Sequence, residues 1–141
     1  MQRVVIDTNV LVSALIQRPY PYHIISNIIE DRNMQWCISE MTFQEYQSVL
    51  TRARFSRYPG FISKAELLLA SVETIAIMIK PEIRLKIIND DGDNRFLELA
   101  LESKADFLIT GNTADFTMAN YKQTRIVSPR IFWEEYGSGK R

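Results

Sequence analysis

Several acidic residues lie next to apolar stretches, where a buried carboxylate needs a compensating partner. Asp7 directly follows the apolar run VVI, Glu45 lies within the amphipathic stretch EMTFQEYQSVL, and Asp93 precedes the apolar-periodic stretch NRFLELAL. Carboxylates gathered in one cleft repel one another and raise each other's pKa. A bound divalent cation removes that conflict, and oxygen ligands without cysteine or histidine suit Mg²⁺ or Mn²⁺. The acids therefore predict metal-assisted chemistry.

Other common site chemistries lack their residues. His23 is the single histidine of the chain, so neither a histidine-based zinc site nor a Ser-His or Cys-His triad has its usual members. Cys37 is the single cysteine, which excludes an internal disulfide and favours a reducing, cytoplasmic setting. Metal-assisted chemistry is what remains.

Short apolar runs alternate with amphipathic stretches, which predicts an α/β fold. We expect a strand over residues 2–7, a helix ending before Pro19 and Pro21, and a further helix over HIISNIIED. A second strand is expected at residues 35–39, followed by the helix that carries Glu45. The carboxyl ends of parallel strands form the ligand edge of such sheets, so the acids are expected to meet there.

The position of Glu45 on its helix is informative. At about 100 degrees per residue, Glu45 lies about 40 degrees from Val49 around the helix axis, so it borders the stripe of apolar residues. A purely solvated glutamate at the edge of the core is the alternative. The periodicity favours a side chain that points inward.

The second half of the chain contains further predicted elements. SKAE, residues 63–66, has the pattern of a capping box at a helix start, whereas residues 74–88 fit either strand or loop. A helix is expected over NRFLELALESKA, then strands at DFLIT and RIV, then a last helix started by Ser128 and Pro129. The segment TGNTADF, with Asn112 and Asp115, follows the DFLIT strand.

Size and composition set the limits of the function. A chain of 141 residues with 46% hydrophobic and 24% charged residues is expected to fold as one globular domain over 1–141. The longest apolar runs fall short of the roughly 20 residues that span a bilayer, so no membrane segment or signal peptide is expected. Because the formal net charge is zero, nucleic-acid binding would have to be local. The densest basic run comprises Arg52, Arg54, Arg57 and Lys64; a phosphate-guiding surface and a solvated face are equally compatible with it.

These segments together resemble the PIN-domain nucleases, in particular the VapC-like ribonucleases that are toxin components of bacterial toxin–antitoxin pairs. The resemblance covers nearly the whole chain through VVIDTNVLVSAL, ISEMTFQEYQSVLTRARF, DDGDNRFLELAL and ADFLITGNTADF followed by RIVSPRIFWE. It implies a three-layer α/β/α sandwich with a central, mostly parallel sheet. It also implies an Mg²⁺- or Mn²⁺-dependent endoribonuclease with RNA as substrate, a small antitoxin as partner, and a homodimer.

The resemblance also assigns site residues. The family's metal-binding acids correspond to Asp7, Glu45 and Asp93, and its fourth acid falls in TGNTADF. Many relatives have an acid directly after the glycine, where this chain has Asn112, so we assign the fourth carboxylate to Asp115 and a supporting amide role to Asn112. The remaining predicted contacts to the substrate or the acids are Thr8, Asn9, Arg52 and Arg54.

Each acid also has a simpler structural interpretation. Asp7 and Asp93 could be helix N-caps, and Asp115, like Asp90 and Asp91, could serve a turn.

Three alternatives to a metal-dependent nuclease make different demands on the sequence. A haloacid-dehalogenase-like phosphatase needs a second Asp two residues after the first, where this chain has Asn9. A phosphoacceptor receiver domain needs an acidic pair after the first strand and a lysine after the last, and neither is present. A PIN fold that binds RNA with weak or lost catalysis remains open because of Asn112.

Overall fold

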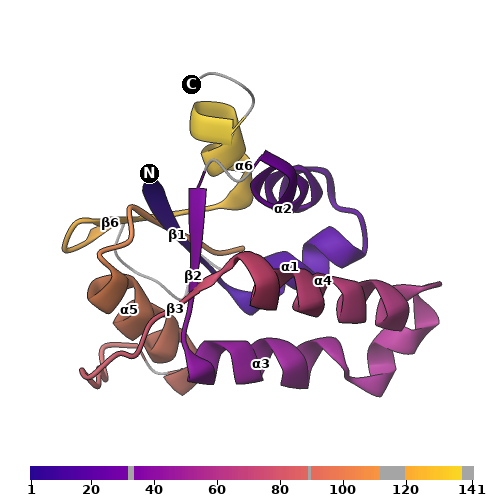
Figure 1. The fold of residues 1–141 in the computed structure, drawn as a ribbon, viewed down its shortest axis with the longest axis horizontal. Coiled ribbons are helices and arrows are strands. Elements are labelled where there is room, and N and C mark those ends of the chain that lie inside the picture. Colours follow the sequence, from indigo (N-terminus) through magenta and orange to yellow (C-terminus); the bar gives the residue numbers. More distant parts are fainter. Residues whose placement is uncertain (32–33, 89, 112–119, 138–141) are drawn as a thin grey trace.

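A six-stranded sheet forms the centre of the protein. The computed structural model describes residues 1–31, 34–88, 90–111 and 120–137. The strands lie in the order β3-β2-β1-β4-β6-β5, and β5 alone pairs antiparallel. Their bounds are β1 Gln2–Ile6, β2 Met34–Ile38, β3 Ile77–Met78, β4 Phe107–Ile109, β5 Asn120–Tyr121 and β6 Thr124–Val127. The predicted α/β fold with a mostly parallel sheet is confirmed (Figure 1).

Helices cover both faces of this sheet. They are α1 Thr8–Leu15, α2 Pro19–Asp31, α3 Glu40–Leu50, α4 Phe61–Ile75, α5 Asp91–Ser103 and α6 Pro129–Phe132, with the 3-10 helix η1 Ala53–Arg57 and the π-helix η2 Trp133–Gly137. The chain moves from β1 to β2 to β3 in one direction and returns to β4 through α5. Because parallel crossovers are right-handed, α5 lies on the face opposite to α1, α2 and α4, and Figure 1 shows these helices on either side of the strands. The three-layer arrangement is therefore as predicted.

The central strands are apolar because both of their faces are covered. Val4, Val5 and Ile6 of β1 are fully buried, and so are Leu108 and Ile109 of β4. Ile6 is in register with Ile109, so the two strands end at the same level of the sheet. The residues that follow them emerge side by side.

Two sequence predictions about helix starts need correction. The first helix ends before the prolines, as predicted, but the helix expected over HIISNIIED begins earlier. Pro19 and Pro21 occupy the first turn of α2, where the missing N–H groups have no intrahelical partner to lose. The predicted capping box at Ser63 is wrong, because α4 already begins at Phe61 after Gly60 in a left-handed conformation (φ +74°).

The capping box lies instead at the start of α3. The backbone N–H of Thr42 donates to Oγ of Ser39 (3.1 Å), and the backbone N–H of Ser39 donates to Oγ1 of Thr42 (2.9 Å). Both residues are buried, so this cap fixes where α3 leaves β2. The register of Glu45 along α3 follows from it.

The ambiguous stretch 74–88 is mostly irregular. It contains the end of α4 and the two-residue strand β3, whose ladder continues with the N–H of Ile79 donating to the carbonyl of Ile38 (2.7 Å). Pro81 follows, and residues 81–88 and Asp90 lie in neither a helix nor a strand. Among the described residues, no helix is long and apolar enough to cross a membrane.

Candidate active site

The acids meet at the carboxyl end of the sheet, between β1 and β4. Asp7 directly follows β1 and Thr110 directly follows β4, and the N–H of Asp7 donates to the carbonyl of Ile109 (2.9 Å). The strand order reverses here, since β1 leads to β2 and β3 on one side whereas β4 leads to β6 on the other. Open α/β sheets bind ligands at such a reversal.

Asp7 is held in place by hydrogen bonds and is 5% exposed. Its Oδ2 accepts from Oγ1 of Thr110 (2.8 Å) and from Nδ2 of Asn9 (3.2 Å), and Oδ1 of Asn9 in turn accepts from the N–H of Gly111 (3.0 Å). Burial raises the pKa of Asp7 to about 6; the Thr110 hydrogen bond opposes this rise, and the nearby Glu45 charge adds to it. The folded chain by itself disfavours the negative charge, so a cation in the pocket would be stabilising.

Asp7 occupies the N-cap position of α1, the alternative role that the sequence suggested. Its backbone carbonyl accepts from the N–H of Val10 (3.0 Å). The hydrogen bonds from Thr110 and Asn9 show that its carboxylate is also engaged within the site. Only the backbone of Asp7 caps α1, because its carboxylate makes no capping hydrogen bond.

Glu45 comes from the second turn of α3 and is half-buried, as its helical position predicted. Its Oε2 accepts a short hydrogen bond from Oγ1 of Thr8 (2.6 Å). The next residue, Tyr46, is fully buried, and its hydroxyl donates to the carbonyl of Ile6 while accepting from Nε1 of Trp36 (3.3 Å). These bonds tie α3 to the end of β1 and bring Glu45 toward Asp7.

The third acid comes from the start of α5. Asp93 is the third residue of this helix, and the N-cap is Asp90, whose Oδ1 accepts from the N–H of Asp93 (3.1 Å). Gly92 lies against both neighbouring acids: a Cβ there would stand 2.6 Å from Oε1 of Glu45 and 3.0 Å from Oδ1 of Asp90. A side chain at position 92 would make these carboxylates shift from where they stand.

A pocket of about 450 Å³ collects these side chains. It is lined by Asp7, Thr8, Asn9, Val12, Ser13, Glu45, Val49, Arg54, Phe55, Asp90 and Asp93. Of the predicted basic residues, Arg54 lines the pocket, with its guanidinium carbon 5.0 Å from the centroid of the Phe55 ring. Arg52 stands at the N-cap of η1 and is not part of the pocket lining. Asn112 and Asp115 lie outside the described residues.

Sequence reasoning assigned Asp90 only to a turn and overlooked Thr110. Asp90 caps α5 and also lines the pocket, two roles that one carboxylate can combine. Thr110 could have been found from its position, because it follows its strand just as Asp7 follows β1. A hydroxyl at that place can donate to the neighbouring acid.

The donor types in the pocket fit a hard cation. Four carboxylate residues line it, and the single histidine is elsewhere, with His23 stacked on Trp133 at 5.5 Å between ring centroids. Within the part of the chain that the structure describes, no three Asp, Glu, His or Cys side chains converge closely enough to hold a metal as they stand. The pocket therefore has oxygen donors of the type that a hard cation prefers, although its described acids are not gathered into a ligand set.

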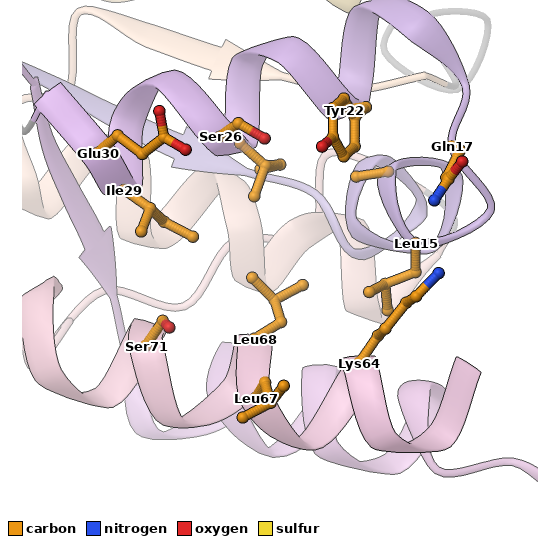
Figure 2. Close-up of a pocket in the computed structure, with 12 residues that line it drawn as sticks. Leu15, Gln17, Tyr22, Ser26, Ile29, Glu30, Lys64, Leu67, Leu68 and Ser71 are labelled. Atoms are coloured by element: carbon orange, nitrogen blue, oxygen red, sulfur yellow. The ribbon is translucent and has the colours of Figure 1, made fainter. Parts of the chain in front are cut away.

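A second, more apolar cavity of about 550 Å³ lies between α1, α2 and α4 (Figure 2). Leu15, Ile29 and Leu68 line it, and Leu67 at its edge is 70% exposed. Glu30 and Lys64 contribute opposite charges to the lining.

The family follows from comparison with known proteins. A family model described as "PIN domain" matches residues 3–114, a span that includes all the described acids of the pocket. The chain belongs to the PIN-domain family. PIN domains are generally nucleases, and the pocket of this one has the acidic character that such chemistry requires.

The chain is also similar to a curated relative and to a solved structure. This PIN domain is 27% identical over 143 residues to the uncharacterized protein MJ1680 of Methanocaldococcus jannaschii, covering 95% of this chain and 91% of that protein. It also resembles a chain of the crystal structure of VapBC2 from Rickettsia felis bound to a DNA fragment from the promoter. The TM-score is 0.58 at 16% identity, covering 90% of this chain and 98% of the other. The structural likeness confirms the PIN-like fold.

Proposed function

We propose that this PIN domain is a divalent-metal-dependent endoribonuclease that hydrolyses phosphodiester bonds. The observation that carries the proposal is that Asp7, Glu45 and Asp93, which come from three distant parts of the chain, line one pocket at the reversal of strand order. The local sequence patterns around these acids single out the same three residues. Such convergence is expected of a site and not of unrelated surface acids.

Each residue of the pocket has a role in this proposal. Asp7, Glu45 and Asp93, with Asp115 as the fourth acid, would hold Mg²⁺ or Mn²⁺, which supplies charge stabilisation at the phosphate and activation of water. Thr110 and Asn9 orient Asp7, and Thr8 orients Glu45. Asn112 supports Asp115.

The substrate is proposed to be RNA, with Arg54 contacting its phosphates. The guanidinium of Arg54 lies over the ring of Phe55 at the pocket, where it could meet a phosphate without being drawn into the acids. Arg52 would act further along the same strand of RNA, outside the pocket lining.

The experiment is a cleavage assay with one sequence supplied as single-stranded RNA and as single-stranded DNA. We expect cleavage of the RNA in Mg²⁺ or Mn²⁺, loss of it in EDTA, and a large loss in Asp93→Asn. RNA binding without cleavage under every metal condition would favour a PIN fold that only binds RNA.

We further propose that the protein is the toxin of a toxin–antitoxin pair and forms a homodimer. The structural neighbour is a VapBC2 assembly, and the apolar cavity between α1, α2 and α4 offers a place for an antitoxin segment. Expression of the chain alone should slow bacterial growth, and Asp93→Asn should relieve this at equal protein level. If both versions are equally toxic, nuclease activity is not the cause.

The cavity can be tested with the product of a small adjacent gene as the antitoxin. Leu67→Glu places a charge at the edge of the cavity and should weaken the complex, whereas Ile131→Glu changes an exposed apolar residue on α6, outside the cavity lining, and should not. Equal binding by the two variants would place the partner elsewhere. Light scattering on the free protein decides between a monomer and a homodimer.

A further inference from the structure

An irregular segment, residues 82–88, runs along α5 and is held by side chains of that helix; we call it the strap. Oε1 of Glu102 accepts from the N–H of Glu82 (3.1 Å), and Oε2 of Glu98 accepts from the N–H of Leu85 (2.7 Å). The four-residue spacing places these glutamates on one face of α5. The strap therefore runs antiparallel to the helix, toward its N-terminus.

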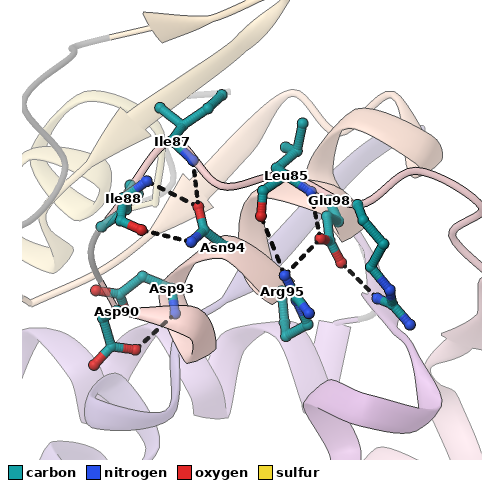
Figure 3. A network of polar contacts seen from close by, with 9 residues as sticks. Leu85, Ile87, Ile88, Asp90, Asp93, Asn94, Arg95 and Glu98 are labelled. Carbon is teal, nitrogen blue, oxygen red and sulfur yellow. Dashed lines mark hydrogen bonds and ion pairs between the residues drawn. The ribbon is translucent and has the colours of Figure 1, made fainter.

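Asn94 continues this face by one more turn and holds the end of the strap (Figure 3). It is fully buried; its Oδ1 accepts from the N–H groups of Ile87 (3.1 Å) and Ile88 (2.9 Å), and its Nδ2 donates to the carbonyl of Ile88 (2.6 Å). Its own N–H donates to the carbonyl of Asp90 (3.2 Å). One side chain thus satisfies three backbone groups immediately before the N-cap of α5.

A second set of contacts, centred on Glu98, holds the middle of the strap. Glu98 is 1% exposed and forms ion pairs of 2.9 Å with both Arg84 and Arg95. Arg95 also donates to the carbonyl of Leu85 (3.2 Å). Glu98 thus holds the middle of the strap through contacts that Asn94 does not make.

Asn94 lies between that anchor and the acids of the pocket. Asp93 directly precedes Asn94 in α5. Asn94 also binds Ile88, the last residue of the strap, and Asp90 follows Ile88 by two residues. Both Asp90 and Asp93 line the pocket. The side chain of Asn94 is thus one of the described contacts that hold the chain where it enters the acidic site.

We propose that Asn94 is a positioning residue for the metal site, acting through the strap to set the places of Asp90 and Asp93. The proposal rests on the proposed metal-dependent function. Without the Asn94 amide, the N–H groups of Ile87 and Ile88 lose their acceptor and the turn into α5 loosens. The acids then meet a cation in poorer geometry, while the Glu98 anchor and the core are retained.

The test compares Asn94→Ala with Glu102→Ala in the full chain. Both remove a side chain that binds the strap, but Glu102 acts at the end far from the acids. Mn²⁺ affinity is measured by titration, and amide hydrogen exchange is measured in EDTA. We expect Asn94→Ala to weaken Mn²⁺ binding about tenfold or more, as the loss of a residue that orients metal ligands typically does, and Glu102→Ala to leave it nearly unchanged.

Hydrogen exchange provides the metal-free arm. Asn94→Ala should speed amide exchange at Ile87 and Ile88. It should also speed exchange at Asp93, because the N–H of Asp93 is bonded to Asp90. Glu102→Ala should speed exchange only at Glu82. If Asn94→Ala does not fold, Asn94→Ser can be used instead, because the serine hydroxyl is a shorter polar group. Asn94→Ser should weaken Mn²⁺ binding and speed exchange in the same way but to a smaller extent.

Two results would overturn the proposal. One is wild-type Mn²⁺ affinity in Asn94→Ala despite fast exchange at the strap end; the other is an equal loss of affinity in Glu102→Ala, which would indicate general destabilisation. If the wild type itself binds no Mn²⁺, the proposed function fails and the exchange data decide alone. Unchanged exchange at Asp93 in Asn94→Ala would then contradict the positioning role.

Discussion

The hydroxyl of Tyr46 donates a hydrogen bond to the carbonyl oxygen of Ile6 in the buried core. Tyr46 follows Glu45 and Ile6 precedes Asp7, so this contact holds together two acids that are far apart in the sequence. Thr8, which directly follows Asp7, makes a second link by donating a hydrogen bond to Glu45. The relative position of the two acids is therefore fixed by contacts that their neighbours Tyr46 and Thr8 make.

Tyr46→Phe should disturb the site as well as the core. It removes the donor to Ile6 and the acceptor for Trp36, which should lower the free energy of unfolding by about 1–3 kcal/mol. It should also reduce RNA cleavage beyond what the remaining folded fraction explains. Tyr58→Phe is the control, because its hydroxyl bonds only to exposed Arg57 among the described contacts. Full activity in folded Tyr46→Phe would contradict a role in aligning the acids.

Asp7 should give the metal-free protein an unusual pH dependence. Its pKa is raised from 3.8 to about 6, so between these values the unfolded chain is ionised while the folded chain keeps the proton. Stability should therefore fall as the pH rises through this window, by up to roughly 3 kcal/mol for this group. Asp7→Asn should remove this contribution. The check is urea unfolding in EDTA at pH 4.5 and 7.5; an equal pH effect in wild type and variant would contradict it.

Addition of Mg²⁺ or Mn²⁺ at pH 7.5 should reverse the penalty on Asp7. Binding to the folded state alone raises the melting temperature with increasing metal concentration. Asp7→Asn should lose most of that rise, because the amide carries no charge to attract the ion. Equal melting shifts in wild type and Asp7→Asn would place the bound ions outside the shared pocket.

Gly92→Ala should affect activity without lowering stability. Alanine in place of glycine within a helix normally stabilises by about 0.5–1 kcal/mol. Here the added Cβ would meet Glu45 at 2.6 Å, and the end of that flexible side chain must move away. We therefore expect unchanged or higher stability with weaker Mn²⁺ binding and slower cleavage. A variant as active as the wild type would show that Glu45 can move without loss.

The meeting of Asp7, Glu45 and Asp93 in one pocket was predictable from the sequence because the signals are local. An apolar strand that ends in Asp7, and a helical period that places Glu45 beside the apolar stripe, each follow from a few neighbouring residues. The strap was not predictable, since residues 82–88 are held by side-chain contacts to α5 instead of by a backbone ladder. The start of α4 was missed because Gly60, and not the Ser63 pattern, precedes the helix. Tertiary contacts decided the strap, whereas the backbone conformation of Gly60 decided the start of α4.

The fourth acid can be assigned by substitution. If Asp115 completes the metal site, Asp115→Asn should reduce RNA cleavage by a factor similar to Asp93→Asn, and higher Mn²⁺ should restore part of it. Asn112→Ala should cost less, because a neutral amide attracts a cation more weakly than a carboxylate does. Asn112→Asp should keep or raise activity. Wild-type cleavage in Asp115→Asn together with none in Asn112→Ala would assign the fourth position to the amide.

The most direct measurement is the rate of RNA cleavage as a function of Mn²⁺ concentration, for the wild type and for Glu45→Gln. Glu45 is the acid to test, because it lines the pocket and contributes to the raised pKa of Asp7. We predict no cleavage in EDTA, a rate that saturates with Mn²⁺ in the wild type, and a much lower rate with a higher half-saturating concentration in Glu45→Gln. Cleavage that persists in EDTA, or the same metal dependence in both proteins, would contradict a metal site built on these acids.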